Sequence, residues 1–176
     1  MIVCLQKTDI AVRYSAMPML YSTTCAYAIR AMCRLTVLGQ GRYVQVGDIC
    51  DDTDLPAPFV AKVLRELVGA GLLTSSKGRG GGYALAKPAE KIGLIDIVEA
   101  IDGKDHCNRC VVGLSACNDK QPCPQHDSFM PVRANIANYL KGTTLAAMAE
   151  ALQGKLDILG KTLAEAESGR PVIKRR

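Results

Sequence analysis

The sequence predicts a mainly α-helical chain with one small β-hairpin. Apolar residues recur at three- and four-residue intervals in several segments, and two short strand-like stretches enclose a glycine-rich run. The chain has 176 residues, 48% of them hydrophobic and 22% charged, which is the composition of a globular domain with an appended element. No apolar run reaches the roughly 20 residues that span a bilayer, so we do not expect an integral membrane protein.

A first helix is predicted from Ser22 to about Gly39. Its apolar face recurs at helical spacing and comprises Cys25, Ile29, Met32, Cys33, Leu35 and Leu38. Because cysteine is small and commonly buried, Cys25 and Cys33 are expected in the hydrophobic core.

Two further helices follow, with a polar turn between them. The second helix is marked by Val44, Val46, Ile49 and Cys50. An acidic run at residues 51–54 and Pro56 then end it, and Pro58 suits the first turn of a third helix, where a missing N–H costs little. The third helix ends at Gly69, and its apolar face comprises Phe59, Val60, Val63, Leu64, Leu67 and Val68.

A hairpin and a fourth helix come next. Residues 72–74 and 83–85 have strand character, and the sequence SSKGRGGG between them predicts a mobile, glycine-rich tip. Apolar residues from Ile92 to Ile101 then predict another amphipathic helix, which ends at Gly103. Helix, helix, turn, helix and hairpin, in this order, make a winged helix-turn-helix.

Beyond a cysteine-rich segment, a stripe at helical spacing is formed by Phe129, Val132, Ile136 and Leu140. This periodicity alone fits packing inside the chain and pairing of two subunits equally well. Gly142 breaks the helix, and Thr144 can cap a following short helix over residues 145–152.

Positive charge is concentrated on the predicted third helix and hairpin, although the whole chain carries only +5. Between residues 55 and 87 the acid Glu66 is outnumbered by Lys62, Arg65, Lys77, Arg79 and Lys87. Such a helix fits the major groove of DNA, where Lys62 can donate to guanine or to phosphate. Lys77 and Arg79 at the hairpin tip suit the minor groove or its flanking phosphates. Singly these are ordinary surface cations, but their joint placement favours DNA.

The approach to the third helix is apolar. Pro56, Ala57 and Pro58 allow DNA to come close but offer little hydrogen bonding, so we expect sequence readout to rest on few side chains and on DNA shape. The glycine-rich tip does not match a nucleotide-binding loop, because no Lys-Ser/Thr pair follows it and no helix opens after it.

Four of the eight cysteines crowd into seventeen consecutive positions, and His126 follows them: Cys107, Cys110, Cys117 and Cys123. Charged residues interrupt the apolar start of the chain, so no signal peptide is expected and we take the compartment to be the reducing cytoplasm. Clustered thiolates in such a compartment favour a metal site.

An iron–sulfur cluster, of the 2Fe–2S or 4Fe–4S type, fits this segment better than zinc. Zinc sites usually pair cysteines two residues apart, as Cys107 and Cys110 are, whereas the intervals of six and five residues that follow wrap more easily around a larger core. His126 is a candidate fourth, exchangeable ligand. Cys107 is an alternative ligand, a resolving thiol or a bystander. A thiol switch without metal, in which neighbouring cysteines form disulfides on oxidation, stays open.

With these residues assembled, the chain resembles the Rrf-two family of bacterial winged-helix regulators, which includes an iron–sulfur-cluster regulator and a nitric-oxide sensor. The resemblance runs from about Met19 to about Leu152. It rests on YAIRAM, LPAPFVAKVLRELVGAGLL, SKGRGGGYALAKPAEKIGLIDIVEAIDG and CVVGLSACNDKQPCPQHDSF.

The resemblance implies specific roles. The implied cluster ligands are Cys110, Cys117 and Cys123, with His126 as a candidate fourth. The implied DNA contacts are Lys77 in the wing and, at recognition-helix positions, Pro56, Pro58, Phe59 and Lys62. In the family a long helix after the cysteine loop pairs two subunits, and the stripe at 129–140 fits that helix. Two features depart from the family: the first cysteine interval is six residues instead of five, and prolines stand where polar side chains are common.

The chain is therefore expected to comprise five segments. They are an N-terminal extension (1–18), the winged helix-turn-helix (19–103), a cysteine-rich cluster-binding loop (104–127), a dimerisation helix with a following short helix (128–152), and a C-terminal helix with a basic tail (153–176). The extension has no clear period, and it is either a genuine arm or a stretch upstream of a translation start at Met17 or Met19.

The expected function is a homodimeric transcription regulator that binds a double-stranded DNA operator and whose cluster senses redox, nitric oxide or iron status. The alternative is a thiol-switched or small-ligand-sensing winged-helix repressor without a cluster. An enzyme is not expected, since His106 and His126 are the two histidines and neither stands in a recognisable nucleophile or acid–base arrangement.

Overall fold

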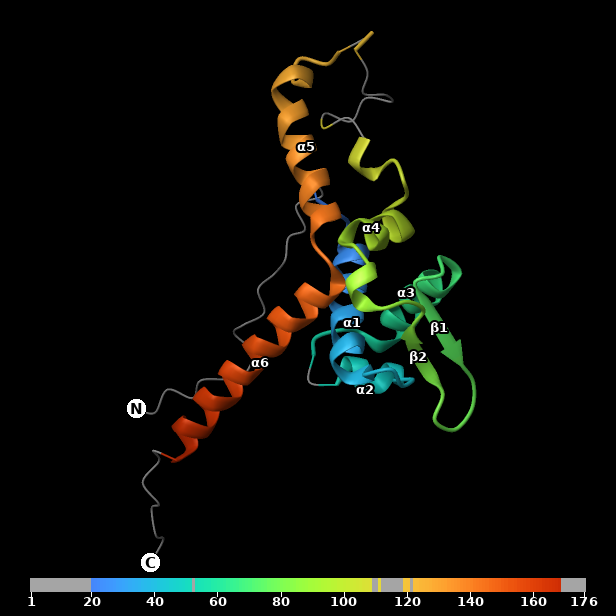
Figure 1. Ribbon diagram of the computed structural model, residues 1–176, viewed down its shortest axis with the longest axis vertical. Coiled ribbons are helices and arrows are strands. Elements are labelled where there is room, and N and C mark those ends of the chain that lie inside the picture. Colours follow the sequence, from blue (N-terminus) through green and yellow to red (C-terminus); the bar gives the residue numbers. More distant parts are fainter. Residues whose placement is uncertain (1–19, 52, 109–110, 112–118, 121, 169–176) are drawn as a thin grey trace, which may run out of the picture.

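The computed structural model describes residues 20–51, 53–108, 111, 119–120 and 122–168. Over these residues the chain is mostly helical, with one two-stranded antiparallel sheet. Helices α1 to α4 and the hairpin form one body, from which α5 and α6 leave in different directions (Figure 1). The predicted fold class, mainly helical with a hairpin wing, is confirmed. Among the described residues no helix is long and apolar enough to cross a membrane.

Helix α1 (Thr23–Gly39) is the centre of the core. Its start is capped by Ser22, whose hydroxyl accepts a hydrogen bond from the Cys25 N–H at 3.1 Å. Cys25 and Cys33 are 0% and 3% exposed, as expected of small core residues. Helices α3, α4 and α6 all pack against α1.

The helix-turn-helix consists of α2 (Val46–Cys50) and α3 (Ala57–Gly69). Pro58 lies in the first turn of α3 as predicted. Val44, expected in the second helix, is instead extended: its N–H and C=O bond to the C=O and N–H of Tyr83 at 2.9 and 2.8 Å. The valine adds a short third segment to the hairpin because an unpaired sheet edge lies within reach.

The wing is formed by β1 (Leu73–Ser76) and β2 (Gly82–Leu85), paired antiparallel so that Leu73 lies opposite Leu85. Gly82 has a φ of 145° and passes close to Val44, whose carbonyl oxygen would lie 2.2 Å from any Cβ added at this glycine. A side chain at this position would therefore push the Val44 segment off the sheet.

A short 3-10 turn, η1 (Ala89–Lys91), leads into α4 (Leu94–Asp102). The helix begins two residues later than the sequence periodicity indicates, because the Asp96 carboxylate accepts from the Gly93 N–H at 3.0 Å and fixes the start there. Ile92, just before α4, is still fully buried. A second turn, η2 (His106–Asn108), opens the cysteine-rich segment.

The last two helices are α5 (His126–Gly142) and α6 (Leu145–Ser168). Their junction is fastened to the segment before α4, since Leu94 donates to the Thr143 carbonyl at 2.9 Å and Leu145 to the Ile92 carbonyl at 2.8 Å. The sequence analysis expects a break near residue 152, whereas α6 runs through it as one helix of 24 residues. Alanine, leucine, lysine and glutamate, all strong helix formers, outweigh the single glycine at 154.

Candidate DNA interface and cysteine loop

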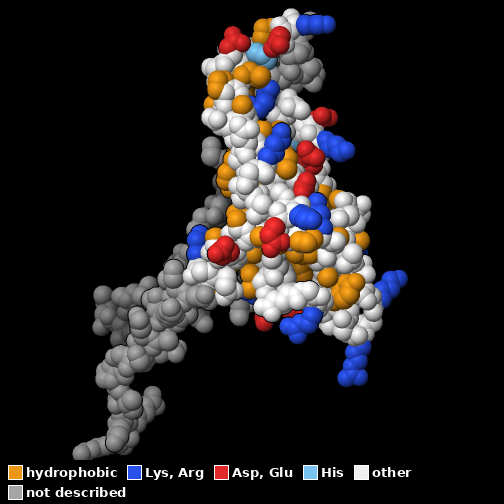
Figure 2. Space-filling view, in the orientation of Figure 1, with side chains coloured by type: hydrophobic (Ala, Val, Ile, Leu, Met, Phe, Trp, Pro, Cys, Tyr) orange, Lys and Arg blue, Asp and Glu red, His pale blue; other side chains and the backbone are white. Residues whose placement is uncertain are grey.

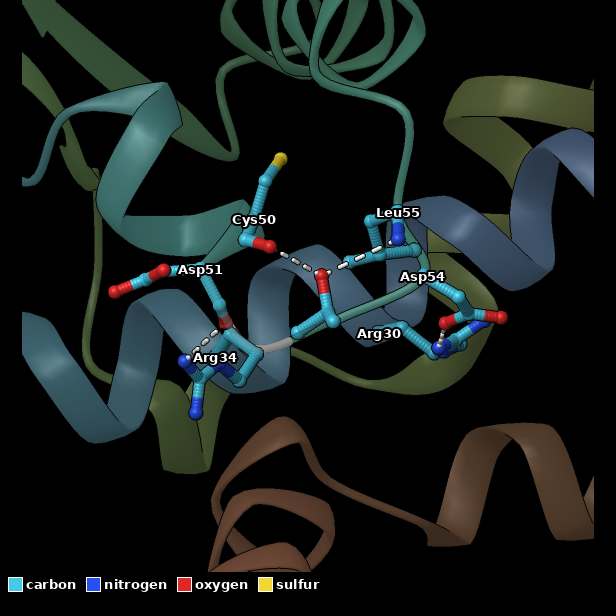
Figure 3. A network of polar contacts seen from close by, with 7 residues as sticks. Arg30, Arg34, Cys50, Asp51, Asp54 and Leu55 are labelled. Atoms are coloured by element: carbon cyan, nitrogen blue, oxygen red, sulfur yellow. Dashed lines mark hydrogen bonds and ion pairs between the residues drawn. The ribbon is translucent and has the colours of Figure 1, made fainter. Parts of the chain in front are cut away.

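Two arginines of α1 hold the turn between α2 and α3 (Figure 3). Arg34 donates to the Asp51 carbonyl oxygen at 3.0 Å, and Arg30 forms an ion pair with Asp54. The hydrogen bond from Arg30 lowers the pKa of the Asp54 carboxyl below its usual value. The turn is thereby fastened to α1 at both of its ends.

A threonine braces the same turn from inside. The Thr53 hydroxyl donates to the Cys50 carbonyl at 2.7 Å and accepts from the Leu55 N–H at 3.2 Å (Figure 3). Leu55 itself is 5% exposed and anchors the turn in the core. The path of the chain into α3 is consequently set by the hydrogen bonds of a single hydroxyl and by one buried leucine.

Phe59 lies on the inner flank of α3. Its ring meets the ring of Tyr27 from α1 edge to face, with centroids 5.4 Å apart. The phenylalanine is half-buried, so its contacts in the described chain are with α1. It orients the start of α3, whereas the resemblance implies a contact with DNA.

The other predicted DNA-binding side chains are exposed. Helical spacing puts Pro58, Lys62 and Arg65 on the face of α3 opposite its buried residues, and Pro56 is exposed just before it. Lys77 and Arg79 are exposed at the wing tip. Figure 2 shows Lys and Arg side chains projecting from the hairpin side of the molecule.

Lys87 is less available than its charge suggests. Its ammonium lies 3.4 Å from the Asp96 carboxylate of α4. The cationic surface that faces outward is therefore carried by Lys62, Arg65, Lys77 and Arg79.

Two of the four predicted cluster ligands lie in the described chain. Cys123 and His126 are 9% and 7% exposed at the start of α5, and the His126 N–H donates to the Cys123 carbonyl at 2.9 Å. The His126 Nε2 lies 2.9 Å from a carboxylate oxygen of Asp119. Cys110 and Cys117 fall outside the described residues. Among the described side chains no group of three or more metal-binding residues comes together.

Cys107 has different surroundings. It packs against the main hydrophobic core, to which Cys123 does not belong. Burial, and then the negative charge of Glu99, raises the pKa of the Cys107 thiol. A protonated, half-buried thiol is a poor metal ligand and a slow nucleophile. These surroundings favour the bystander role over the ligand role for Cys107.

The sequence analysis missed a polar cluster at the entry to the cysteine loop. Asp102, at the end of α4, accepts from the Ser22 N–H at 2.7 Å and from its hydroxyl at 2.5 Å. His106 Nε2 lies 3.0 Å from the Leu20 carbonyl, and its Nδ1 lies 3.8 Å from Asp102. The aspartate lies between serine and histidine, an order that does not activate a nucleophile. No local pattern links residues that are 80 or more positions apart.

This fold and this surface are found in known proteins. The profile of the Rrf2 family, described as an iron-dependent transcriptional regulator, matches residues 21–151. A protein of Aquifex aeolicus (strain VF5) assigned as an HTH-type transcriptional regulator is 34% identical over 129 residues, which cover 72% of this chain and 89% of that protein.

Two solved structures are similar in fold and sequence. IscR of T. potens has a TM-score of 0.60 and 26% identity, covering 78% of this chain and 90% of IscR. The oxidized form of Staphylococcus aureus CymR has a TM-score of 0.58 and 26% identity, covering 73% of this chain and 94% of CymR. The family match spans the helix-turn-helix, the wing, the cysteine loop and the start of α6. The chain belongs to the Rrf2 family of DNA-binding transcription regulators.

Proposed function

We propose that this protein is a cytoplasmic, homodimeric transcription regulator whose cysteine loop holds an iron–sulfur cluster that senses redox, nitric oxide or iron status and modulates binding to a DNA operator. The main support is the pair Cys123 and His126. Both side chains are buried at the first turn of α5, where the cysteine loop meets the helix that leaves the DNA-binding body.

The donor set suits such a cluster. Cys110, Cys117 and Cys123 would supply thiolates and His126 an imidazole, and a cluster bound there supplies a redox-active iron–sulfide core that nitric oxide and oxidants attack. Asp119, by accepting from the Nε2 N–H of His126, would fix the tautomer that leaves the lone pair on Nδ1. The type of cluster, 2Fe–2S or 4Fe–4S, does not follow from these residues.

The DNA contacts are assigned to two elements. Helix α3 enters the major groove with Pro56, Pro58, Lys62 and Arg65, and the wing reaches the minor groove or its phosphates with Lys77 and Arg79. Phe59 acts indirectly, by holding the start of α3 against Tyr27.

Helix α5 is assigned to the dimer interface. Its large apolar side chains Met130, Val132 and Tyr139 are 43%, 42% and 49% exposed, which leaves an apolar face uncovered within the chain. The cysteine loop joins the end of α4 to the start of α5, so a change at the cluster would shift α5 and alter the spacing of the two reading heads on their half-sites.

An anaerobic purification tests the proposal. The protein should be coloured and should contain iron and acid-labile sulfide in comparable amounts. Cys123→Ser should abolish the colour and the sulfide, whereas the matched control Cys107→Ser should keep both. Colourless protein with one zinc per chain would contradict the cluster.

A second candidate is a thiol-switched repressor without metal, and the similarity to an oxidized form of CymR favours it. This protein would show oxidant-dependent disulfides among its loop cysteines and no iron absorbance. Mass spectrometry of the oxidised and reduced protein separates the two functions.

A further inference from the structure

The start of the recognition helix presents carbon where side chains that read DNA usually carry polar groups. Pro56, Ala57 and Pro58 are exposed, and Ala61 is half-exposed. Pro58 and Lys62 lie on the same outward stripe, with Ala61 beside them. Within the first two turns of α3, Lys62 is thus the one hydrogen-bonding side chain on this face, and Arg65 follows it one turn later.

The backbone of this turn offers little more. Pro56 and Pro58 have no N–H, and the N–H groups of Phe59 and Val60 both bond to the Pro56 carbonyl at 3.0 Å. In the first turn of α3, which is fully described, only the Ala57 N–H is left to donate to a phosphate or a base edge.

The carbon surface is also held rigidly. The prolines have a restricted φ, and the turn before them is fastened by the Arg30–Asp54 ion pair. Tyr27 holds Phe59 on the opposite flank. No rotamer change can exchange this surface for a polar one, because proline and alanine carry no polar side-chain atoms.

Only one base offers a carbon group to such a surface. In the major groove guanine, cytosine and adenine present hydrogen-bond donors and acceptors, whereas thymine adds a C5-methyl group. Carbon placed over the polar edges would remove water from them without replacing its hydrogen bonds, at a cost in binding free energy. Carbon placed over a methyl group buries apolar surface on both sides.

We propose that this recognition helix selects thymine through its C5-methyl group at the base pairs that face Pro58 and Ala61. Lys62 adds one polar contact, to guanine or to phosphate. This inference rests on the proposed binding of α3 in the major groove and adds the base class that the helix reads there.

The test uses the full chain and a random-sequence duplex DNA library. Sequences that the protein enriches are footprinted, and each thymine in the protected region is replaced by deoxyuridine, which removes only the methyl group. We expect affinity to fall about fourfold (about 0.8 kcal/mol) at each thymine that faces the helix. Uracil at thymines outside the protected bases is the control and should leave affinity unchanged.

A pair of variants checks the side chain. Ala61→Gln adds an amide suited to adenine, so its selected sequences should gain adenine at one position and lose the uracil effect there. Ala147→Gln, an exposed alanine of α6, is the matched control and should select the sequences of the unmodified protein.

The outcomes are distinct. An enriched sequence that binds equally well with uracil at every protected thymine overturns thymine reading and leaves operator binding intact. Failure to enrich any sequence overturns operator binding, and thymine reading with it.

Discussion

Helices α1 and α5 have the same length, 17 residues, and opposite surroundings. Nearly half of α1 is buried, including Cys25, Met32 and Leu35, whereas α5 buries only His126 and Leu140. Helix α1 is the framework of the reading head, because it packs against α3, α4 and α6. Helix α5 instead leaves the body and is fastened mainly at its C-terminal end.

The difference separates folding from assembly. The apolar side chains of α1 are satisfied inside the chain, so their loss acts on the stability of the fold. Those of α5 divide into two groups: Phe129, Ile136 and Leu140 turn toward the chain, and Val132 turns outward with Met130 and Tyr139. The outward group is available to a second subunit. Each prediction below pairs a change in the reading head with a control or with its partner.

The largest effect is expected from a cavity under α1. Met32 is fully buried, so Met32→Ala should lower the free energy of unfolding by about 2–5 kcal/mol in chemical denaturation. Val132→Ala, on the exposed face of α5, should change it by less than about 1 kcal/mol. Equal losses would show that α5 belongs to the folding core after all.

A smaller loss is expected from the wing. Gly82→Ala places a Cβ against the Val44 carbonyl and should lower the free energy of unfolding by about 1–3 kcal/mol. Gly142→Ala, at the end of α5, meets no neighbour within 4 Å and should be neutral or stabilising. If both substitutions are neutral, the close approach of Val44 and Gly82 is not required for the wing.

Removal of a wing cation should change DNA binding without changing stability. Lys77→Ala should make the slope of log K against log salt shallower by about 0.9, as expected for one lost phosphate contact. Lys141→Ala, exposed on α5, should leave the slope unchanged. Fluorescence anisotropy at several salt concentrations measures both, and identical slopes would remove the wing from the interface.

The smallest effect is expected at the surface of the helix-turn-helix turn. Arg30→Ala should cost less than about 1 kcal/mol near neutral pH, because the ion pair with Asp54 is solvent-exposed. The pKa of Asp54 is lowered in the folded protein, so this contribution is present above the unfolded value of 3.8 and is lost as pH falls through the folded value. In a double-mutant cycle, Asp54→Asn added to Arg30→Ala should cost nothing more.

Much of the fold could be predicted because its signals are local. The Ser22 cap, the glycine that ends α1 and the proline at the start of α3 each act within one helical turn. Val44 could not be placed in this way, because its pairing with Tyr83 joins residues far apart in the sequence. The continuity of α6 past residue 152 was missed because propensity summed over the whole helix outweighs a weak period.

The site was predictable in the kinds of residue it uses and less so in their orientation. Lys62, Arg65, Lys77 and Arg79 are exposed as expected, since long cations seldom lie in a core. The inward packing of Phe59 on Tyr27 and the bond from Ser22 to Asp102 depend on which helices meet.

The sequence by itself determined which segments are helical, which residues carry charge and thiols, and which face of each helix is apolar, because these properties follow from local spacing and side-chain chemistry. Only the tertiary structure decided which apolar faces are covered. Helices α1 and α5 both carry apolar side chains, but the core of one chain has room to bury only α1, and α5 is left exposed. Periodicity tells that a face seeks burial, whereas the packing of the other helices decides whether that burial is found within the chain.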